Sequence, residues 1–253
     1  MKFLLAKISF IISMGVITAL HFTVDDFSLV WLALPVICFF ILVISGSYFI
    51  KLDFFLKSVN NLGLNENRVA ITFDDGPDTN TQHVLDVLDK YNAKATFFLI
   101  GSKIEKNADV VQEIITRGHA VGNHSYSHSN LFPLKNPVQI EEEIIKTNKL
   151  IKKISGVETS IFRPPFGVTN PMVAKGIKRA GMTSIGWNVR SYDTVEDDVE
   201  KVSNRVINKI NPGSIILLHD DREHTPQILE RILQYINQMN FETVTLNNEI
   251  ELK

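Results

Sequence analysis

Two adjacent carboxylates at the end of a predicted strand are the first candidates for chemistry. An apolar run from Val69 to Phe73 ends at Asp74 and Asp75, and Gly76-Pro77 then turns the backbone out of the strand. Successive strand residues point to opposite sides, so one carboxylate can bind a cation while its neighbour handles a proton. A solvated Asp-Asp-Gly turn is the alternative interpretation, because such turns are common.

Two histidines four residues apart are the second candidates. His124 and His128, in the segment His-Ser-Tyr-Ser-His, have a spacing at which one turn of chain can aim both imidazoles at a single ion. An unconnected pair of surface histidines is the alternative. Together with Asp75 they would form a set of one carboxylate and two imidazoles, which leaves open positions for water as in a catalytic zinc site. Cys38 is the single cysteine, so an internal disulfide and a Cys-x-x-Cys metal site are both excluded.

The elements that must position these groups follow from residue 68 onward. Apolar runs alternate there with helical patterns, which predicts roughly seven strand-helix units and a parallel α/β sheet, open or closed into a barrel. We expect helices at 82–91, 108–117, 137–153, 173–180, 197–210 and 225–239, and strands at 69–73, 95–100, 120–122, 160–163, 182–189, 214–219 and 242–246. Working residues of such folds lie at the carboxyl ends of the strands. The polar residues at or just after predicted strand ends are Asp74, Asp75, His124, Arg163, Asp193 and His219.

The first fifty residues have a different composition. Residues 8–24 and 27–50 contain no Asp, Glu, Lys or Arg, and about 20 apolar residues suffice to span a bilayer. We therefore expect a membrane hairpin of two transmembrane helices at 1–50, a linker at 51–67 and a catalytic domain at 68–253. A signal peptide for the first stretch, or two core helices of a soluble domain, are the alternatives.

Loop charge gives a small bias in membrane orientation. Lys2 and Lys7 precede the first stretch and Lys51 and Lys57 follow the second, whereas Asp25 and Asp26 lie between them. By the positive-inside rule, both ends and the large domain are placed on the cytoplasmic side. The formal net charge of -2 gives no basic field, so we expect no nucleic acid partner.

Four segments together resemble the polysaccharide deacetylase family, also called carbohydrate esterase family 4 or the NodB-homology domain. They are Thr72-Phe-Asp-Asp-Gly-Pro77, His124-Ser-Tyr-Ser-His128, Arg163-Pro-Pro-Phe-Gly167 and Leu217-Leu-His219, in the family's order, and the resemblance covers residues 66–247. It implies a distorted (β/α)7-type barrel and the metal-dependent removal of N-acetyl, sometimes O-acetyl, groups from sugars.

The resemblance also implies a metal site and a base. Asp75, His124 and His128 would bind a divalent metal, with Zn²⁺ expected and Co²⁺, Ni²⁺ or Mn²⁺ as alternatives. Asp74 would be the base that takes a proton from a metal-bound water as the water attacks the acetyl carbonyl. Arg163 would hydrogen-bond Asp74 and hold it in place.

The remaining implied roles concern the leaving group and the substrate. His219 would be the general acid that protonates the leaving amine, and Asp193 would pair with it. The backbone amide of Phe166 would donate to the oxyanion, and Leu217 would line the pocket for the acetyl methyl group.

Two positions depart from the common family pattern. Arg190 stands where many relatives have Asp, and Thr194 stands where many have Trp, which removes one wall of the expected sugar groove. For Arg190 we expect an ordinary ion pair; recognition of an acidic or phosphorylated glycan is the alternative.

These observations lead to one main functional hypothesis. The chain would deacetylate an N-acetylated glycan, such as peptidoglycan, an N-acetylglucosamine polymer or a lipid-linked sugar, while its N-terminal helices contact membrane lipid. A catalytically silent glycan-binding membrane protein on the same fold and an amidohydrolase of a non-sugar amide are the alternatives.

Overall fold

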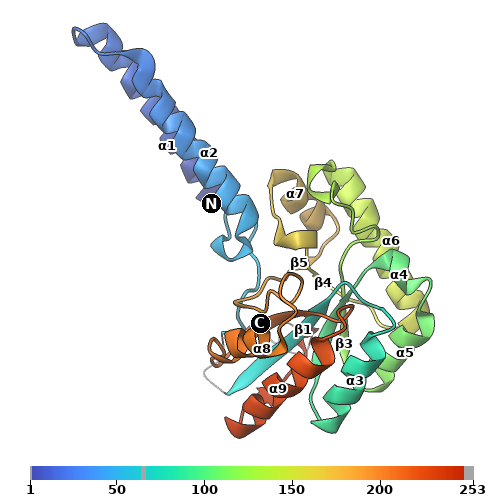
Figure 1. Cartoon of the computed structure of the whole chain (residues 1–253). Coiled ribbons are helices and arrows are strands. Elements are labelled where there is room, and N and C mark those ends of the chain that lie inside the picture. The colour runs from blue at the N-terminus through green and yellow to red at the C-terminus, as the bar shows by residue number, and fades with distance from the viewer. Residues whose placement is uncertain (1, 64–66, 248–253) are drawn as a thin grey trace.

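Two apolar helices project as a hairpin from an α/β domain (Figure 1). The computed structural model describes residues 2–63 and 67–247. Helix α1 (Lys2–Thr23) runs away from the domain, and α2 (Ala33–Tyr48) returns after the short 3-10 helix η1 (Leu29–Leu32). Both Lys2–Thr23 and Leu29–Tyr48 are long and apolar enough to cross a membrane, and a signal sequence would meet the same criterion. At 1.5 Å per residue, α1 is about 33 Å long, close to the thickness of a bilayer's hydrocarbon core.

The domain is built on a parallel sheet of eight strands. They follow the order β5-β4-β3-β2-β1-β7-β6, with β8 paired to β1. Strand β1 is central, and its register places Asp74 directly beside His219 of β7. The strands are β1 (Arg68–Asp74), β2 (Ala95–Leu99), β3 (Ala120–Asn123), β4 (Ile161–Phe162), β5 (Thr183–Ser184), β6 (Val189–Arg190), β7 (Ile215–His219) and β8 (Glu242–Thr243).

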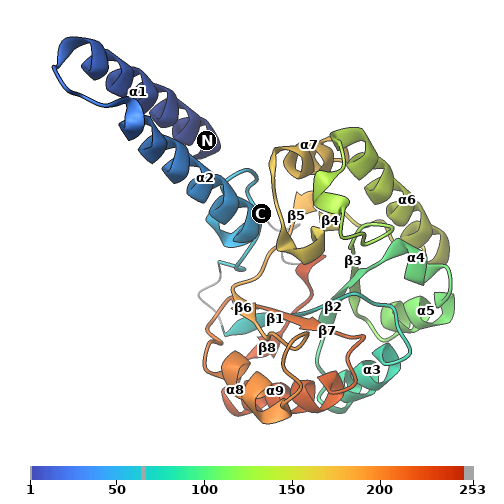
Figure 2. The ribbon, with the colours of Figure 1, turned by 45° about the horizontal axis from the view of Figure 1, so that its top comes forward.

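Helices cover the outer face of this curled sheet (Figure 2). Helix α6 shows how the sequence sets their ends: Asn136 and Gln139 form a capping box, Pro137 occupies the first turn, and Gly156 ends the helix in a left-handed conformation. Inside, the rings of Phe73 and Phe97 stack 4.9 Å apart. The helices are α3 (Thr81–Lys90), α4 (Gly101–Ile104), α5 (Ala108–Thr116), α6 (Pro137–Ser155), α7 (Pro171–Arg179), α8 (Val199–Ile207) and α9 (Thr225–Gln238).

The predicted α/β class is confirmed: the sheet is parallel and curls into a half-barrel. One expected element differs, because the single strand predicted at 182–189 is two short strands, β5 and β6, on opposite edges of the sheet. Gly186 lies between them, packed so closely against Asn60 that a Cβ would not fit. The carbonyl of Gly186 also accepts a hydrogen bond from Arg163 at 3.0 Å, so the chain leaves the ladder there.

The segment between α2 and β1 is anchored at several points. Asp53 lies in the left-handed region (φ 50°), and its Oδ1 accepts the Ser58 amide at 2.9 Å. Ser58 Oγ in turn lies 2.8 Å from Ser184 Oγ, and Val59 bridges to Ile185. Residues expected to link hairpin and domain thus also pack against the sheet.

The end of α2 is itself bonded to the domain. The amide of Thr169 donates to the Ser47 carbonyl at 3.0 Å, and Ile50 is buried with only 4% of its surface exposed. The hairpin therefore meets the domain at the loop that follows the Arg-Pro-Pro-Phe-Gly segment.

Candidate active site

A cavity of about 400 Å³ lies at the carboxyl ends of the central strands. Seven of the nine residues singled out in the sequence line it: Asp74, Asp75, His124, His128, Phe166, Leu217 and His219. The other two, Arg163 and Asp193, lie behind it and are bonded to Asp74 and His219. The structure thus brings together all nine residues at one end of the sheet.

Three of the lining side chains converge as a metal-binding set would. One ligand atom each from Asp75, His124 and His128 lies within 4.8 Å of the others. Asp75 Oδ1 is 3.6 Å from His124 Nε2 and 3.3 Å from His128 Nε2, yet this buried oxygen has no hydrogen-bond partner. A buried carboxylate oxygen facing two ring nitrogens, without a hydrogen bond, fits a cation between them.

The state of the two imidazoles agrees with this fit. His124 Nδ1 lies 2.7 Å from the Arg163 carbonyl, which can only accept, so Nδ1 carries a proton and Nε2 is the ring nitrogen that faces Asp75. Burial, together with the neighbouring His124, lowers the pKa of His128 to about 4. His128 is therefore neutral near pH 7 and can act as a metal ligand.

Asp75 is held as a carboxylate. Burial alone would raise its pKa, but the positive charges that His124, His128, His219 and Lys103 carry at the acidic pH where a carboxylate titrates outweigh burial and lower the pKa below its ordinary value. Its backbone lies in the left-handed region (φ 72°), so the side chain leaves the line of β1 and turns into the cavity.

Asp74 is held by a fully buried arginine. Arg163 Nη1 donates to Asp74 Oδ1 at 2.8 Å and to Thr72 Oγ1 at 2.8 Å. The guanidinium carbon of Arg163 lies 4.1 Å from the Phe98 ring centroid, which adds a cation–π contact. The pair fixes one oxygen of Asp74 and leaves the other, Oδ2, 3.7 Å from His124 Nε2.

His219 and Asp193 form a second charged pair. His219 Nδ1 lies 2.8 Å from Asp193 Oδ1, and the His219 amide donates to Asp193 Oδ2 at 2.8 Å. Burial would lower the pKa of His219, but the bond to Asp193 and the charges of Asp74 and Asp75 prevail and raise that pKa to about 9. The imidazole is thus protonated at neutral pH and can donate a proton.

Phe166 and Leu217 both line the cavity, the first exposed and the second buried. Phe166 has φ 60° in the 3-10 turn Pro165–Gly167, is 44% exposed, and places its ring 4.8 Å from that of His128. Gly167 (φ 66°) packs against Trp187 without room for a Cβ. Leu217 is buried on β7 with 2% of its surface exposed, so it supplies an apolar floor.

Arg190 and Thr194 both line the cavity. The expected ion pair of Arg190 is absent among the described residues. Its guanidinium instead lies over two rings, 4.8 Å from the centroid of Tyr192 and 5.6 Å from that of Trp187. Stacking on aromatic faces suits the planar guanidinium and leaves its charge without an internal carboxylate partner.

Three further residues contribute that the sequence did not single out. Thr72 bonds Arg163, Ser191 Oγ donates to Asp193 Oδ1 at 2.7 Å, and Tyr48 at the end of α2 lines the cavity. Thr72 belongs to the segment Thr72–Pro77 on which the family resemblance rests, so the sequence could have identified it. Tyr48 lies in an apolar run, and nothing in its local pattern separates it from its neighbours.

Comparison with known proteins assigns the family. The polysaccharide deacetylase family profile matches residues 62–185. A peptidoglycan-N-acetylglucosamine deacetylase of Bacillus cereus is 36% identical over 198 residues, which is 75% of this chain and 91% of that protein. Longer relatives, such as the peptidoglycan deacetylase PgdA of Listeria monocytogenes, are covered over only 38% of their length.

Two solved structures share the fold. The peptidoglycan deacetylase PdaC from Bacillus subtilis has a TM-score of 0.69 at 30% identity, covering 74% of this chain and 92% of that one. A family 4 acetyl xylan esterase from Clostridium thermocellum, solved with a cobalt ion, has a TM-score of 0.67 at 36% identity, covering 73% of this chain and 90% of that one. Given this agreement in sequence and fold, the chain belongs to the polysaccharide deacetylase family and is a hydrolase that deacetylates an acetylated glycan.

Proposed function

We propose that this protein is a membrane-anchored, divalent-cation-dependent N-deacetylase of a glycan. One observation supports this most strongly: a carboxylate held by a buried arginine, an Asp-His-His set and a protonated histidine all meet in one cavity of about 400 Å³. Hydrolysis of an amide requires a base for water, an electrophile for the carbonyl and an acid for the amine. This cavity offers a candidate for each.

Asp75, His124 and His128 would hold the cation. When bound, a divalent metal supplies Lewis-acid activation of water and of the acetyl carbonyl. Two imidazoles and one carboxylate suit Zn²⁺, with Co²⁺, Ni²⁺ and Mn²⁺ as further candidates. The related acetyl xylan esterase was solved in complex with a cobalt ion, which supports a transition metal as the cofactor.

The proton transfers fall to Asp74 and His219. Asp74, oriented by Arg163, accepts the proton of the attacking water, and His219, oriented by Asp193, gives a proton to the departing nitrogen. Water oxygen forms the new bond to the acetyl carbon and the C–N bond breaks, which yields acetate and a free amine. The Phe166 amide would stabilise the oxyanion, and the acetyl methyl group would rest on Leu217.

Acetate release from N-acetylglucosamine oligomers by the full-length protein tests this proposal. Removal of metal by a chelator should abolish release, and added Zn²⁺ should restore it. Asp74→Asn should lower kcat by roughly 10²–10⁴-fold, because a general base contributes about that much. Asp89→Asn, a surface carboxylate paired with Arg117, serves as the matched control.

The outcomes separate the hypotheses. A Zn²⁺-dependent release that Asp74→Asn removes would establish the deacetylase. No release from sugar oligomers or acetyl esters with any of the four metals would contradict it, and would favour a silent glycan-binding protein.

We also propose that α1 and α2 are both inserted in the membrane. Their large apolar side chains face outward, such as Ile11 at 66% and Ile44 at 64% exposure, as lipid contact requires. The lysine bias of the flanking segments favours the cytoplasmic side for the catalytic domain.

A further inference from the structure

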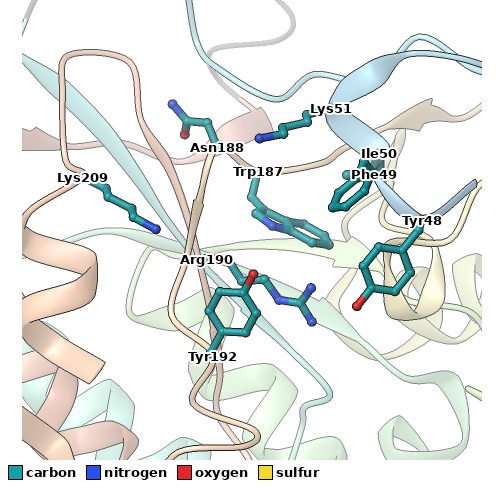
Figure 3. A pocket seen from close by; sticks show the side chains of 9 residues that line it. All are labelled: Tyr48, Phe49, Ile50, Lys51, Trp187, Asn188, Arg190, Tyr192 and Lys209. Carbon is teal, nitrogen blue, oxygen red and sulfur yellow. The ribbon is translucent and has the colours of Figure 1, made fainter. Parts of the chain in front are cut away.

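A second pocket adjoins the catalytic cavity on the side of the hairpin (Figure 3). Its volume is about 160 Å³, and it shares Tyr48, Trp187 and Arg190 with the catalytic cavity. Lys51 and Lys209 line only this second pocket. A ligand in the catalytic cavity can therefore extend past Trp187 and Arg190 into it. We call this second space the basic-aromatic pocket.

The charge of the basic-aromatic pocket is uncompensated. Lys51, Arg190 and Lys209 line it, while no Asp or Glu of the described chain does. None of these three cations has an ion pair among the described residues. Figure 3 shows them reaching the pocket from three different parts of the chain: Lys51 after α2, Arg190 on β6 and Lys209 after α8. A pocket lined by three cations and by no carboxylate of the described chain favours an anion from outside, and the planar Arg190 suits phosphate oxygens.

The pocket is also fixed at the membrane end of the domain. Tyr48 ends α2, and Phe49, Ile50 and Lys51 follow it directly. The Thr169 amide holds the Ser47 carbonyl at 3.0 Å, so this junction has a defined position relative to the catalytic loop. Tyr and Trp side chains are typical of the interface between lipid and water. An anionic group bound here would lie between the bilayer and the sugar.

We infer that the basic-aromatic pocket binds the phosphate or diphosphate ester of a lipid-linked acetylated sugar, whose acetamido group occupies the catalytic cavity. The inference rests on the proposed deacetylase function and names its substrate class. The phosphate chemistry would also fit a nucleotide-linked sugar, but the position beside α2 favours the lipid carrier.

The test compares three substrates on the full-length protein in lipid nanodiscs: a neutral N-acetylglucosamine tetramer, an N-acetylglucosaminyl diphospho-polyprenol and a nucleotide-linked N-acetylglucosamine. The expected order of kcat/KM places the polyprenol substrate at least tenfold above the other two. Lys209→Gln and Lys51→Gln should each lower kcat/KM about tenfold or more on the polyprenol substrate, since each removes a charge-assisted contact. The ratio to the neutral tetramer should fall by the same factor.

Lys201→Gln is the matched control, because Lys201 lies on α8, the helix that Lys209 follows, but pairs with Asp198 at 3.4 Å and does not line the pocket. A preference for the nucleotide-linked sugar, lost in Lys209→Gln, would support the phosphate site and assign a soluble source. Equal losses on the neutral and phosphorylated substrates, or no loss on either, would overturn the inference.

A binding measurement distinguishes failure of this inference from failure of the deacetylase proposal. In a Trp31→Phe background Trp187 is the single tryptophan, and its fluorescence reports the pocket. Inorganic pyrophosphate, added to metal-free protein so that it cannot bind a cation, should change this signal, with at least tenfold weaker binding in Lys209→Gln. Pyrophosphate binding by the metal-free protein, combined with no acetate release by the Zn²⁺-loaded protein, would support the pocket and contradict the catalytic proposal. Absence of pyrophosphate binding would overturn the pocket.

Discussion

At the scale of single residues, the charged pairs in the site differ in what surrounds them. His219 keeps its proton because Asp193 is bonded to both its ring and its amide, at 2.8 Å in each case. Asp74 faces a fully buried guanidinium whose other bonds go to Thr72 and Gly186. A substitution in one of the two pairs leaves the contacts of the other intact, so the two pairs can be tested separately.

The pKa of His219, raised to about 9, sets the alkaline limb of the pH profile. An acid catalyst must be protonated, so kcat/KM should stay constant as the pH rises to about 9 and should fall above it. Asp193→Asn removes the main interactions that raise this pKa, which then drops towards its ordinary value of 6.5. Activity at pH 8 should then fall about 30-fold, since only a few per cent of the imidazole keeps its proton. Full pH–rate profiles check this, with Asp197→Asn as the control; an unmoved alkaline limb would exclude His219 as the acid.

Replacement of Arg163 should lower the stability of the folded domain. Arg163→Met leaves the buried Asp74 carboxylate without a partner, which should cost about 3–5 kcal/mol of unfolding free energy. Arg179→Met, which removes an exposed pair with Glu141, should cost less than about 1 kcal/mol. Urea unfolding in detergent, followed by tryptophan fluorescence, measures both. If Asp74→Asn does not recover part of the loss in the Arg163→Met background, the charge is not the cause.

At the scale of elements, the strand-helix alternation and the motif residues could be predicted, because both depend on local patterning. The helix predicted at 137–153 is α6 (Pro137–Ser155), and the one predicted at 225–239 is α9 (Thr225–Gln238). The break between β5 and β6 could not be predicted, since it depends on Asn60 packing on Gly186 from 126 residues away. The contribution of Tyr48 to the cavity likewise depends on how α2 meets the domain.

The 3-10 turn at Pro165–Gly167 offers a matched glycine test. Gly167 (φ 66°) has no room for a Cβ against Trp187, whereas Gly156 (φ 73°) has nothing within 4 Å. Both alanine substitutions should carry the left-handed backbone cost of about 1–2 kcal/mol. Gly167→Ala should add about 1–3 kcal/mol from overpacking and lower activity by displacing Trp187. Thermal unfolding and acetate release measure the two effects; equal losses in both variants would show that the Trp187 contact is unimportant.

At the scale of the whole molecule, the hairpin sets the topology. Both ends of the hairpin lie beside the domain, and its turn, with Asp25 and Asp26, lies at the far tip (Figure 1). If both helices cross the bilayer, the tip and the domain face opposite compartments.

Cysteine labelling tests this arrangement. In a Cys38→Ser background, a membrane-impermeant maleimide should modify Asp26→Cys from one side of the membrane and Glu223→Cys from the other. Detergent-solubilised protein, in which both positions should react, is the control. Labelling of both from the same side of intact vesicles would show that the pair of helices does not span.

The bond between Thr169 and Ser47 has a kinetic consequence for an inserted hairpin. It holds the catalytic cavity at a constant height above the lipid surface, so the protein meets carrier-bound molecules by lateral diffusion within a plane. Turnover would then depend on how many substrate molecules occupy each unit of bilayer area, and dilution of the surrounding solution would leave the rate unchanged.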